Sequence, residues 1–183
     1  MNHQEALSLL KENVKTENLV KHCLAVEAIM RKLAEELNED PEKYSLVGLL
    51  HDIDFERTKD NPKEHGIVSA EMLSGKLDEE MIHTIKSHNF EYTEVMPESR
   101  MDYVLIAADA VSGLVIACAL IMPSKKLSDV NNDSISKKFK SKDFARNCSR
   151  EKMLYCEKIG IEKEKFFEVA LQALQNISSE LGL

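Results

Sequence analysis

Residues 101–122 of the chain read MDYVLIAADAVSGLVIACALIM, the most apolar segment of the sequence. The segment is long enough to cross a membrane as a helix. Asp109 lies near its middle, however, and an aspartate at the centre of a bilayer costs roughly 2.5–3.5 kcal/mol on insertion scales. Asp102, Ser112 and Gly113 interrupt the apolar run further. We therefore expect residues 101–122 to be the core helix of a helical bundle, and we expect no membrane association.

The composition of the whole chain also favours helices. Of its 183 residues, 43% are hydrophobic and 31% are charged, which is ordinary for a soluble globular protein. Aromatic residues make up only 5%, and the chain has only 6 glycines and 4 prolines. This balance favours helix over strand. The sequence predicts an all-α fold, a compact bundle of about seven or eight helices, in one domain over residues 1–183.

Apolar residues recur at three- and four-residue steps along most of the chain. They predict helices over residues 4–14, 19–37, 42–50, 65–73, 78–89 and 101–122, and a closing helix that carries apolar residues from 167 to 181. Pro41 stops the second of these helices, because proline cannot continue one. The third helix delivers His51 and Asp52 at its C-terminal end.

Several features bear on location and partners. The N-terminus, MNHQEALSLLKENVK, has no continuous apolar region and no small-residue cleavage site, so we see no secretory signal. No CxxC pair occurs among the four cysteines, which we interpret as reduced thiols of a cytoplasmic protein: Cys23, Cys118, Cys148 and Cys156. The net charge of −8 argues against a nucleic-acid partner. Whether the chain forms a homo-oligomer is left open.

Asp109 requires a partner, because an ionised carboxylate within an apolar helix is very costly unless it is paired or bound to a cation. The candidate partners are the imidazoles on or beside the apolar faces, which are His22, His51, His65 and His88. His83 lies roughly 160° around its helix from Ile85 and faces away. Imidazoles clustered with carboxylates are typical of a divalent-metal site. A buried Asp–His hydrogen-bonded pair is the alternative that the composition leaves open.

The order of these residues resembles a known family. The pattern of His22, the pair His51-Asp52 and then Asp109 is similar to the H…HD…D pattern of the HD-domain superfamily of metal-dependent phosphohydrolases. The segments LVKHCLAVEAIM, VGLLHDIDFERT and LIAADAVSGLV around them add to the resemblance. It covers about residues 15–125, which it implies to be an HD-type metal-binding core with the site among the central helices. Residues 126–183 would then be a C-terminal basic segment and the closing helix.

The chain also resembles the variant of this superfamily that has two more histidines between the HD pair and the final aspartate. This resemblance implies a dinuclear site in which Asp52 bridges both ions and orients the attacking water. The implied metal ligands are His22, His51, Asp52, His65, His88 and Asp109. The implied cofactor is one or two divalent ions, drawn from Fe, Mn, Co, Ni and Zn. Asp54 stands where the HDIG subgroup has glycine. Two roles of Asp54 remain open: it supports a metal ligand, or it is an acid on the surface.

The activity that the resemblance implies is metal-dependent phosphohydrolysis through metal-activated water. The expected substrate is a nucleotide or another small phosphorylated metabolite. Two alternatives remain open, because the ligand residues do not separate them. Some six-ligand HD proteins are di-iron oxygenases, and the chain is equally compatible with a non-catalytic sensor of a metal or a nucleotide.

A phosphorylated substrate also needs cations from the protein. Between Ser124 and Lys152 the chain carries nine basic and four acidic residues. We predict that Lys125 and Lys126 bind the substrate, because they closely follow the helix that carries Asp109. That position is many residues from the metal site, so the loop after Pro123 would have to fold back over it. The alternative is a solvated surface, which is the usual role of a run of charges.

Overall fold

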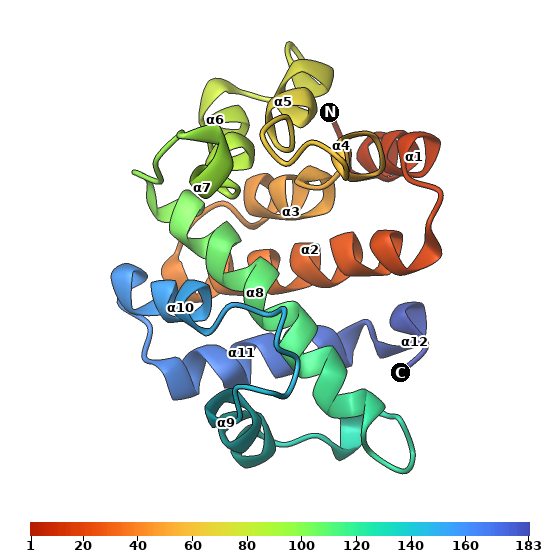
Figure 1. Cartoon of the computed structure of the whole chain (residues 1–183), viewed down its shortest axis with the longest axis vertical. Helices are drawn as coiled ribbons and strands as arrows, with labels where there is room; N and C mark the ends of the chain where they lie inside the picture. Colours follow the sequence, from red (N-terminus) through yellow and green to blue (C-terminus); the bar gives the residue numbers. More distant parts are fainter.

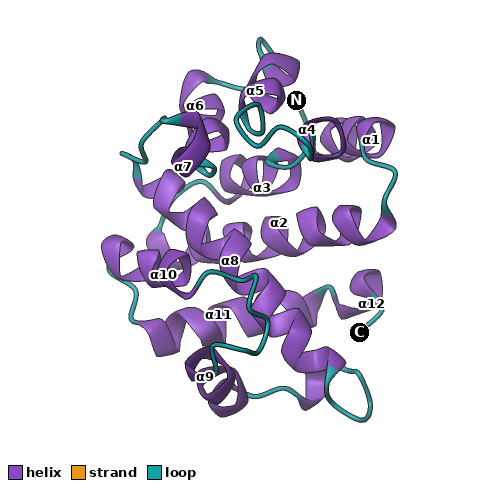
Figure 2. Ribbon diagram, in the orientation of Figure 1, coloured by secondary structure: helices purple, strands orange, loops and turns teal.

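The computed structural model describes residues 1–183, and all its regular elements are helical (Figures 1 and 2). The predicted all-α fold is confirmed. Eight helices have seven residues or more: α1 (His3–Asn13), α2 (Glu17–Leu37), α3 (Pro41–Leu50), α5 (Ile67–Leu73), α6 (Glu79–Ser87), α8 (Arg100–Leu120), α9 (Asn132–Lys140) and α11 (Lys163–Asn176). Four helices have a single turn: α4 (Phe55–Thr58), α7 (Phe90–Thr93), α10 (Arg150–Met153) and α12 (Ser178–Leu181). Two 3₁₀ segments, η1 (Leu127–Asp129) and η2 (Leu154–Ile159), complete the chain.

Helix α8 is the central element, and it runs diagonally across α2 and α11 (Figure 1). A capping box fixes its start, because Ser99 accepts from the Asp102 N–H and the Asp102 carboxylate accepts from the Ser99 N–H. By length and composition α8 is apolar enough to cross a membrane, with a mean hydropathy of 2.1 over its most apolar window, but 67% of that window is buried inside the bundle. The segment is therefore the core helix that the sequence predicts.

The site is positioned by the close approach of α2 and α3. Gly48 of α3 lies against the backbone of α2, where a Cβ atom would stand only 2.8 Å from the Cα of Glu27. Only glycine allows the two helices to pack this closely. The approach brings the C-terminal end of α3, which carries His51, beside the part of α2 that carries His22. Apolar residues of α2 and α3, among them Ile29, Met30 and Leu50, seal the rest of the contact.

The second half of the chain packs on the other side of α2 and α8 (Figure 1). Helix α11 buries Phe166 and Phe167 there. The basic segment between α9 and α10 is held by Arg150, whose guanidinium donates to six backbone carbonyls, those of Lys138, Phe139, Ser141, Phe144, Ala145 and Cys148. One half-buried cation thus organises a loop that has few apolar residues of its own.

Most predicted helix boundaries differ from the structure by one or two residues, and two of the differences have a local cause. The helix expected to open at His65 begins at Ile67, because Gly66 adopts a φ of +88° that no helix contains. The closing helix begins at Lys163 and stops at Asn176, and α12 continues after Ile177, which leaves the helical conformation.

Candidate metal centre

Six side chains from five parts of the chain meet at one point beside α8. They come from α2, the turn after α3, the turn before α5, the C-terminal end of α6 and the middle of α8, and they are His22, His51, Asp52, His65, His88 and Asp109. The structure therefore brings together every residue that the resemblance assigns to the metal. We call this set the His/Asp cluster.

Asp52 lies at its centre. Its Oδ1 atom is 3.4 Å from His51 Nε2, 3.3 Å from His65 Nε2 and 3.5 Å from His88 Nε2. Its Oδ2 atom is 3.7 Å from His22 Nε2. The cluster divides into two groups whose ligand atoms lie within 4.8 Å of one another, and both groups contain Asp52. One carboxylate placed between two sets of imidazoles is the arrangement that a bridging ligand requires.

Asp109 joins the cluster from α8, with its Oδ1 atom 3.1 Å from His22 Nε2. Burial disfavours the charge on His22, but the hydrogen bond and the negative charge of Asp109 outweigh it and raise the pKa of His22 to about 9. Burial likewise raises the pKa of Asp109, and the partner His22 more than offsets this, so the pKa of Asp109 is lowered overall. The partner that Asp109 requires is therefore His22.

Every histidine of the cluster has its second ring nitrogen held by an acceptor. His51 Nδ1 lies 2.8 Å from the Gly48 carbonyl, His88 Nδ1 contacts the Ile85 carbonyl, and His65 Nδ1 lies 2.8 Å from Asp54 Oδ1. Ser112 donates to the Asp109 carbonyl, so its oxygen is free to accept from His22 Nδ1 at 3.4 Å. With the proton on Nδ1 in each ring, all four Nε2 lone pairs point into the cluster.

These residues fit divalent cations. His51 Nε2 is buried and has no hydrogen-bond partner, although a buried nitrogen without a partner is rare in a folded protein. Four nitrogen lone pairs around a carboxylate repel one another and Asp52 unless positive charge lies between them. Imidazole and carboxylate ligands suit Fe, Mn, Co, Ni and Zn. The donor set therefore agrees with the cofactor that the sequence predicts.

Without a cation, protons must supply the missing charge. Burial lowers the pKa of His65, but the hydrogen bonds and charges of Asp52 and Asp54 outweigh it and raise this pKa to about 10. Burial lowers the pKa of His51, which keeps that ring neutral. Burial raises the pKa of Asp52, but the surrounding imidazoles His51, His65, His88 and His22 bring it well below its usual range. Two histidines thus carry the charge that a metal would otherwise supply.

Asp54 supports His65. It is fully buried, and its Oδ2 atom accepts from the backbone N–H groups of Gly66 at 2.9 Å and Ser69 at 2.8 Å, while Oδ1 faces His65. Burial raises the pKa of Asp54, but these contacts lower it further than burial raises it. The alternative of a surface acid is therefore wrong. Such carboxylate–histidine pairs fix the orientation of metal ligands in known sites.

The cluster opens toward solvent on one side. The side chains of Asp109 and His22 are 32% and 26% exposed, whereas His51 is 0% and His88 is 4% exposed. The opening therefore lies between α2 and α8, and α3, α5 and α6 close the remaining sides.

Comparison with known protein families agrees with this geometry. The HD-domain family matches residues 19–114, a range that contains all six residues of the cluster. The chain belongs to the HD-domain family.

Curated relatives of this HD domain include proteins of bacteria and an archaeon. It is 33% identical over 100 residues to ribonuclease Y of Lawsonia intracellularis, and the aligned region covers 54% of this chain and 19% of the relative. It is 33% identical over 101 residues to ribonuclease Y 2 of Bdellovibrio bacteriovorus, covering 54% and 18%. An uncharacterized protein of Methanocaldococcus jannaschii is 45% identical over 78 residues, covering 40% of this chain and 44% of the relative. The HD domain thus spans less than half the length of these relatives. No solved structure matches it.

His83, Lys125 and Lys126 lie outside the cluster of this HD domain. His83 faces away, as predicted, and its Nδ1 atom lies 3.2 Å from Asp102 Oδ2. Both lysines are exposed, and neither side chain forms a hydrogen bond or ion pair. The loop that carries them continues to η1, whose Leu127 carbonyl accepts from Gln175 of α11 at 3.0 Å, at the end of α8 that points away from α3 and α6 (Figure 1). Binding of substrate by these lysines stays a prediction.

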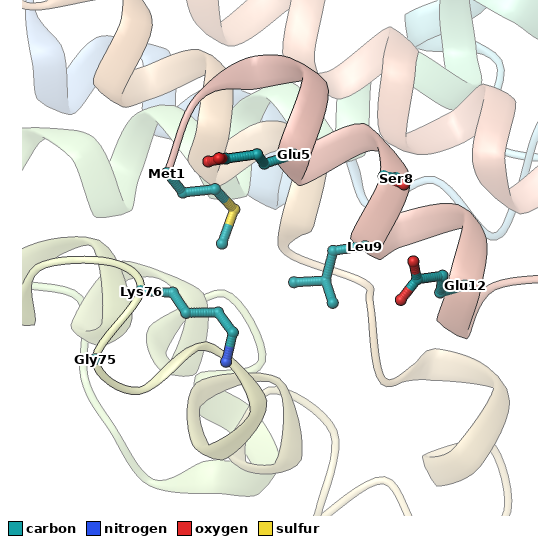
Figure 3. Close-up of a pocket in the computed structure, with 7 residues that line it drawn as sticks. All are labelled: Met1, Glu5, Ser8, Leu9, Glu12, Gly75 and Lys76. Carbon is teal, nitrogen blue, oxygen red and sulfur yellow. The ribbon is translucent and has the colours of Figure 1, made fainter.

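A second hollow of the HD domain, about 520 Å³ in volume, lies between α1 and the end of α5 and is shown in Figure 3. Two of its polar groups already have partners, since Glu5 accepts from the Asn2 N–H at 2.9 Å and Lys76 donates to the Met72 carbonyl at 3.1 Å. No histidine lines it. We therefore place the chemistry of the protein in the His/Asp cluster.

The sequence did not single out three residues that shape the cluster. Gly48 provides the carbonyl for His51, Gly66 donates to Asp54, and Ser112 contacts His22. Two of them are glycines within three residues of a cluster histidine, and glycine there is the only signal that the sequence offers. At Gly66 a Cβ would stand 3.0 Å from the Ile85 carbonyl, in addition to the strain of a positive φ.

Proposed function

We propose that this HD-domain protein is a metal-dependent phosphohydrolase that acts on a nucleotide or another small phosphorylated metabolite. The observation that carries the proposal is the convergence of four imidazole Nε2 atoms on Asp52, one of them buried without any partner. Membership of the HD-domain family supports the same reaction class.

In this proposal the residues of the cluster would hold two divalent cations. His22, His51 and Asp109 would hold one, His65 and His88 would hold the other, and Asp52 would be available to both. When bound, such cations lower the pKa of water and neutralise charge on the phosphoryl oxygens of the substrate. Asp52 lies close to the histidines of both sets, since its Oδ1 atom faces His51, His65 and His88 and its Oδ2 atom faces His22.

The remaining residues keep the ligands in place. Asp54 holds the proton of His65 on Nδ1, and the Gly48 and Ile85 carbonyls do the same for His51 and His88. The closed sides around His51 and His88 exclude water from those rings, which strengthens their contacts to a cation. The exposed edge of Asp109 leaves one direction from which a phosphate can approach.

A second candidate substrate is RNA, and one observation favours it. The relatives with 33% identity are named ribonuclease Y, so the same cluster on a phosphodiester backbone is a coherent alternative. The net charge of −8 favours the small substrate, because an acidic protein repels a polyanion. Its four cysteines are free, which suits a reducing compartment, and the proposal places the protein in the cytoplasm.

Metal analysis and a substrate panel test this proposal. The purified chain is analysed for bound metal, stripped with a chelator and reloaded with Mn²⁺, Fe²⁺ or Zn²⁺. It is then incubated with nucleoside monophosphates, cyclic nucleotides, p-nitrophenyl phosphate and an oligoribonucleotide. We expect metal-dependent release of phosphate from small esters, abolished by the chelator.

Each alternative gives a different result in the same assay. Cleavage of the oligoribonucleotide alone would favour the ribonuclease. Iron-dependent consumption of O₂ would favour the oxygenase. Tight metal binding with no turnover of any substrate would favour the sensor and contradict the proposal.

A further inference from the structure

A groove adjoins the open side of the His/Asp cluster. It has a volume of about 440 Å³ and begins at His22, which is also a member of the cluster. One wall comes from α2, another from α8 and a third from the C-terminal residues, and its lining is Asn18, Lys21, His22, Ile116, Leu120 and residues 181–183. We call it the α2–α8 groove.

The groove continues the face of α8 that carries Asp109. Asp109, Gly113, Ile116 and Leu120 follow one another at steps of four, three and four residues, so they lie on one side of the helix. All four are half-buried or exposed, whereas most other residues of α8 are buried. The groove therefore lies farther along the same face of α8, and His22, which faces Asp109, connects the groove with the cluster.

Gly113 has no side chain, and this leaves space on the same face of α8 for a residue of another segment. Cys148 packs over this glycine, and a Cβ at position 113 would stand 2.6 Å from its sulfur. A larger residue at 113 would push Cys148 and the loop that Arg150 holds away from α8. Cys148 thus covers α8 at Gly113, and the groove lies beyond it, where α2 and α8 form its walls.

The lining chemistry defines what fits. Ile116 and Leu120 offer an apolar surface, and Leu120 is 51% exposed although it is a large aliphatic side chain. Asn18 and Lys21 on α2 offer N–H donors across from it, and Lys21 uses one of its protons on Glu17 at 2.9 Å. A ligand with apolar faces and hydrogen-bond acceptors at its edge matches both walls.

We propose that the α2–α8 groove binds the organic group of the phosphate ester, an aromatic or heterocyclic group with acceptors at its edge, while the phosphate lies at the His/Asp cluster. This inference rests on the proposed function and adds the direction in which the substrate lies. It makes Ile116, Leu120 and Lys21 determinants of substrate specificity. Inorganic phosphate, which has no organic group, would use the cluster alone.

A tryptophan reporter tests the groove separately from catalysis. The chain contains no tryptophan, so Leu120→Trp gives one fluorophore in the groove, and Tyr92→Trp gives a matched exposed fluorophore on α7. Both variants are loaded with Zn²⁺ and titrated with phenylphosphonate and with methylphosphonate, two anions that resist hydrolysis and differ in the ring. We expect a saturable fluorescence change with phenylphosphonate for the groove reporter alone.

Affinity measurements on the unlabelled protein complete the test. We expect phenylphosphonate to bind about tenfold more tightly than methylphosphonate, because its ring moves out of water onto the apolar surface of the groove. Ile116→Ser should remove this preference without weakening methylphosphonate. Ile82→Ser, at a half-buried isoleucine of another hollow, should leave the preference unchanged.

The outcomes separate the two proposals. Equal affinity for both phosphonates, with no reporter response, would overturn the groove and leave the metal-centred hydrolase standing. Failure of both phosphonates to bind the loaded protein would count against the hydrolase and the groove together. A reporter signal that depends on protein concentration without ligand, with a dimer in sedimentation, would show that a second copy covers the groove and would overturn the inference.

Discussion

The His/Asp cluster and the segment 124–152 both concentrate ionisable side chains, but the two regions differ in how these side chains are exposed and paired. In the segment, six of the nine basic residues are exposed, and the half-buried ones already have partners. Arg150 donates to six carbonyls, and Lys152 pairs with Glu91 at 2.6 Å. In the cluster, His51 Nε2 is buried beside Asp52 and has no hydrogen-bond partner.

This difference shows which feature locates a site. The segment is rich in basic residues, yet these face water, hold backbone carbonyls or contact neighbouring side chains. The cluster has fewer charged residues, but it leaves a buried ligand atom without a hydrogen bond and brings four Nε2 atoms to one carboxylate. An unsatisfied buried group is a stronger indication of a missing ligand than a run of exposed charges.

The largest expected effect comes from the residue that both halves of the cluster share. Asp52→Ala should reduce phosphohydrolase activity by roughly 10³-fold, the upper range for loss of one fixed electrostatic contact. Bound metal should fall toward zero, because each pair of imidazoles loses its carboxylate. Inductively coupled plasma mass spectrometry on dialysed protein measures the metal, and circular dichroism checks the fold.

Asp129→Ala is the matched change in the basic segment. Asp129 is exposed and accepts from Ser124 at 2.6 Å, so its loss should leave metal and activity unaltered. If the two variants lost metal to the same degree, the distinction between the cluster and the segment would fail.

Removal of one half of the cluster should have the next largest effect. His88→Ala should lower the metal content from two ions per chain toward one, because His88 belongs to the group of Asp52 and His65 only. His83→Ala is its control, since His83 lies outside the cluster beside Asp102. Metal stoichiometry measured on both variants decides the matter, and equal loss would contradict the assignment of His88.

A smaller effect is expected one contact away from the metal. Asp54→Asn keeps the shape of the side chain but removes the charge that faces His65 Nδ1. Changes at such supporting residues typically cost about 10–100-fold in metal affinity or activity. Competition with a fluorescent zinc chelator gives the affinity. An unchanged affinity in a folded variant would return Asp54 to a purely structural role.

Metal binding should depend on pH in a definite direction. In the metal-free chain the pKa of His22 is raised to about 9 and that of His65 to about 10, so both carry protons at neutral pH. A cation must displace these protons, and its affinity should therefore rise as the pH increases from 7 toward 10. Isothermal titration in two buffers of different ionisation enthalpy counts the released protons.

The raised pKa values of His22 and His65 have the opposite effect on the stability of the metal-free fold, which should fall as the pH rises. Because both pKa values exceed the ordinary 6.5, the two histidines stabilise the folded chain fully below that pH, and this contribution is lost as the pH rises through about 9 and 10. Thermal unfolding of the stripped protein should accordingly show a declining midpoint above neutral pH. Proton release that is absent, with affinity independent of pH, would contradict the two protonated histidines.

The sequence predicted the members of the cluster but not their environment. The resemblance to the HD-domain superfamily implied the six residues, and helix periodicity left out His83. The position of Asp54 could not be predicted, because it depends on the path of the turn between α4 and α5, which returns Gly66 and Ser69 to its oxygens. Spacing along the chain does not specify such a path.

The basic segment was the least predictable part of the fold. Helix α9 buries only Ile135, so it has no apolar period for the sequence to display. The loop after α9 depends on Arg150, whose contacts reach back as far as Lys138. The partial exposure of Asp109 was also missed, because the sequence of an apolar helix does not show which of its faces the neighbouring elements leave uncovered.

The smallest expected effect concerns Lys125 and Lys126. From Asp109 to Leu120 the helix α8 extends roughly 16 Å at 1.5 Å per residue, and both lysines lie beyond it. At an ionic strength of 0.1 M the Debye length is about 10 Å, so any influence on a bound anion is a weak attraction through solvent. Replacing both by glutamine should raise KM for an anionic substrate by no more than about threefold at low salt, leave kcat and metal content unchanged, and weaken the dependence of KM on salt.

The matched control is the same charge removal at Lys137 and Lys140, two exposed lysines of α9. An effect confined to Lys125 and Lys126 that persists at high salt would mean direct contact with substrate, and the loop after Pro123 would then have to fold back over the cluster when substrate binds.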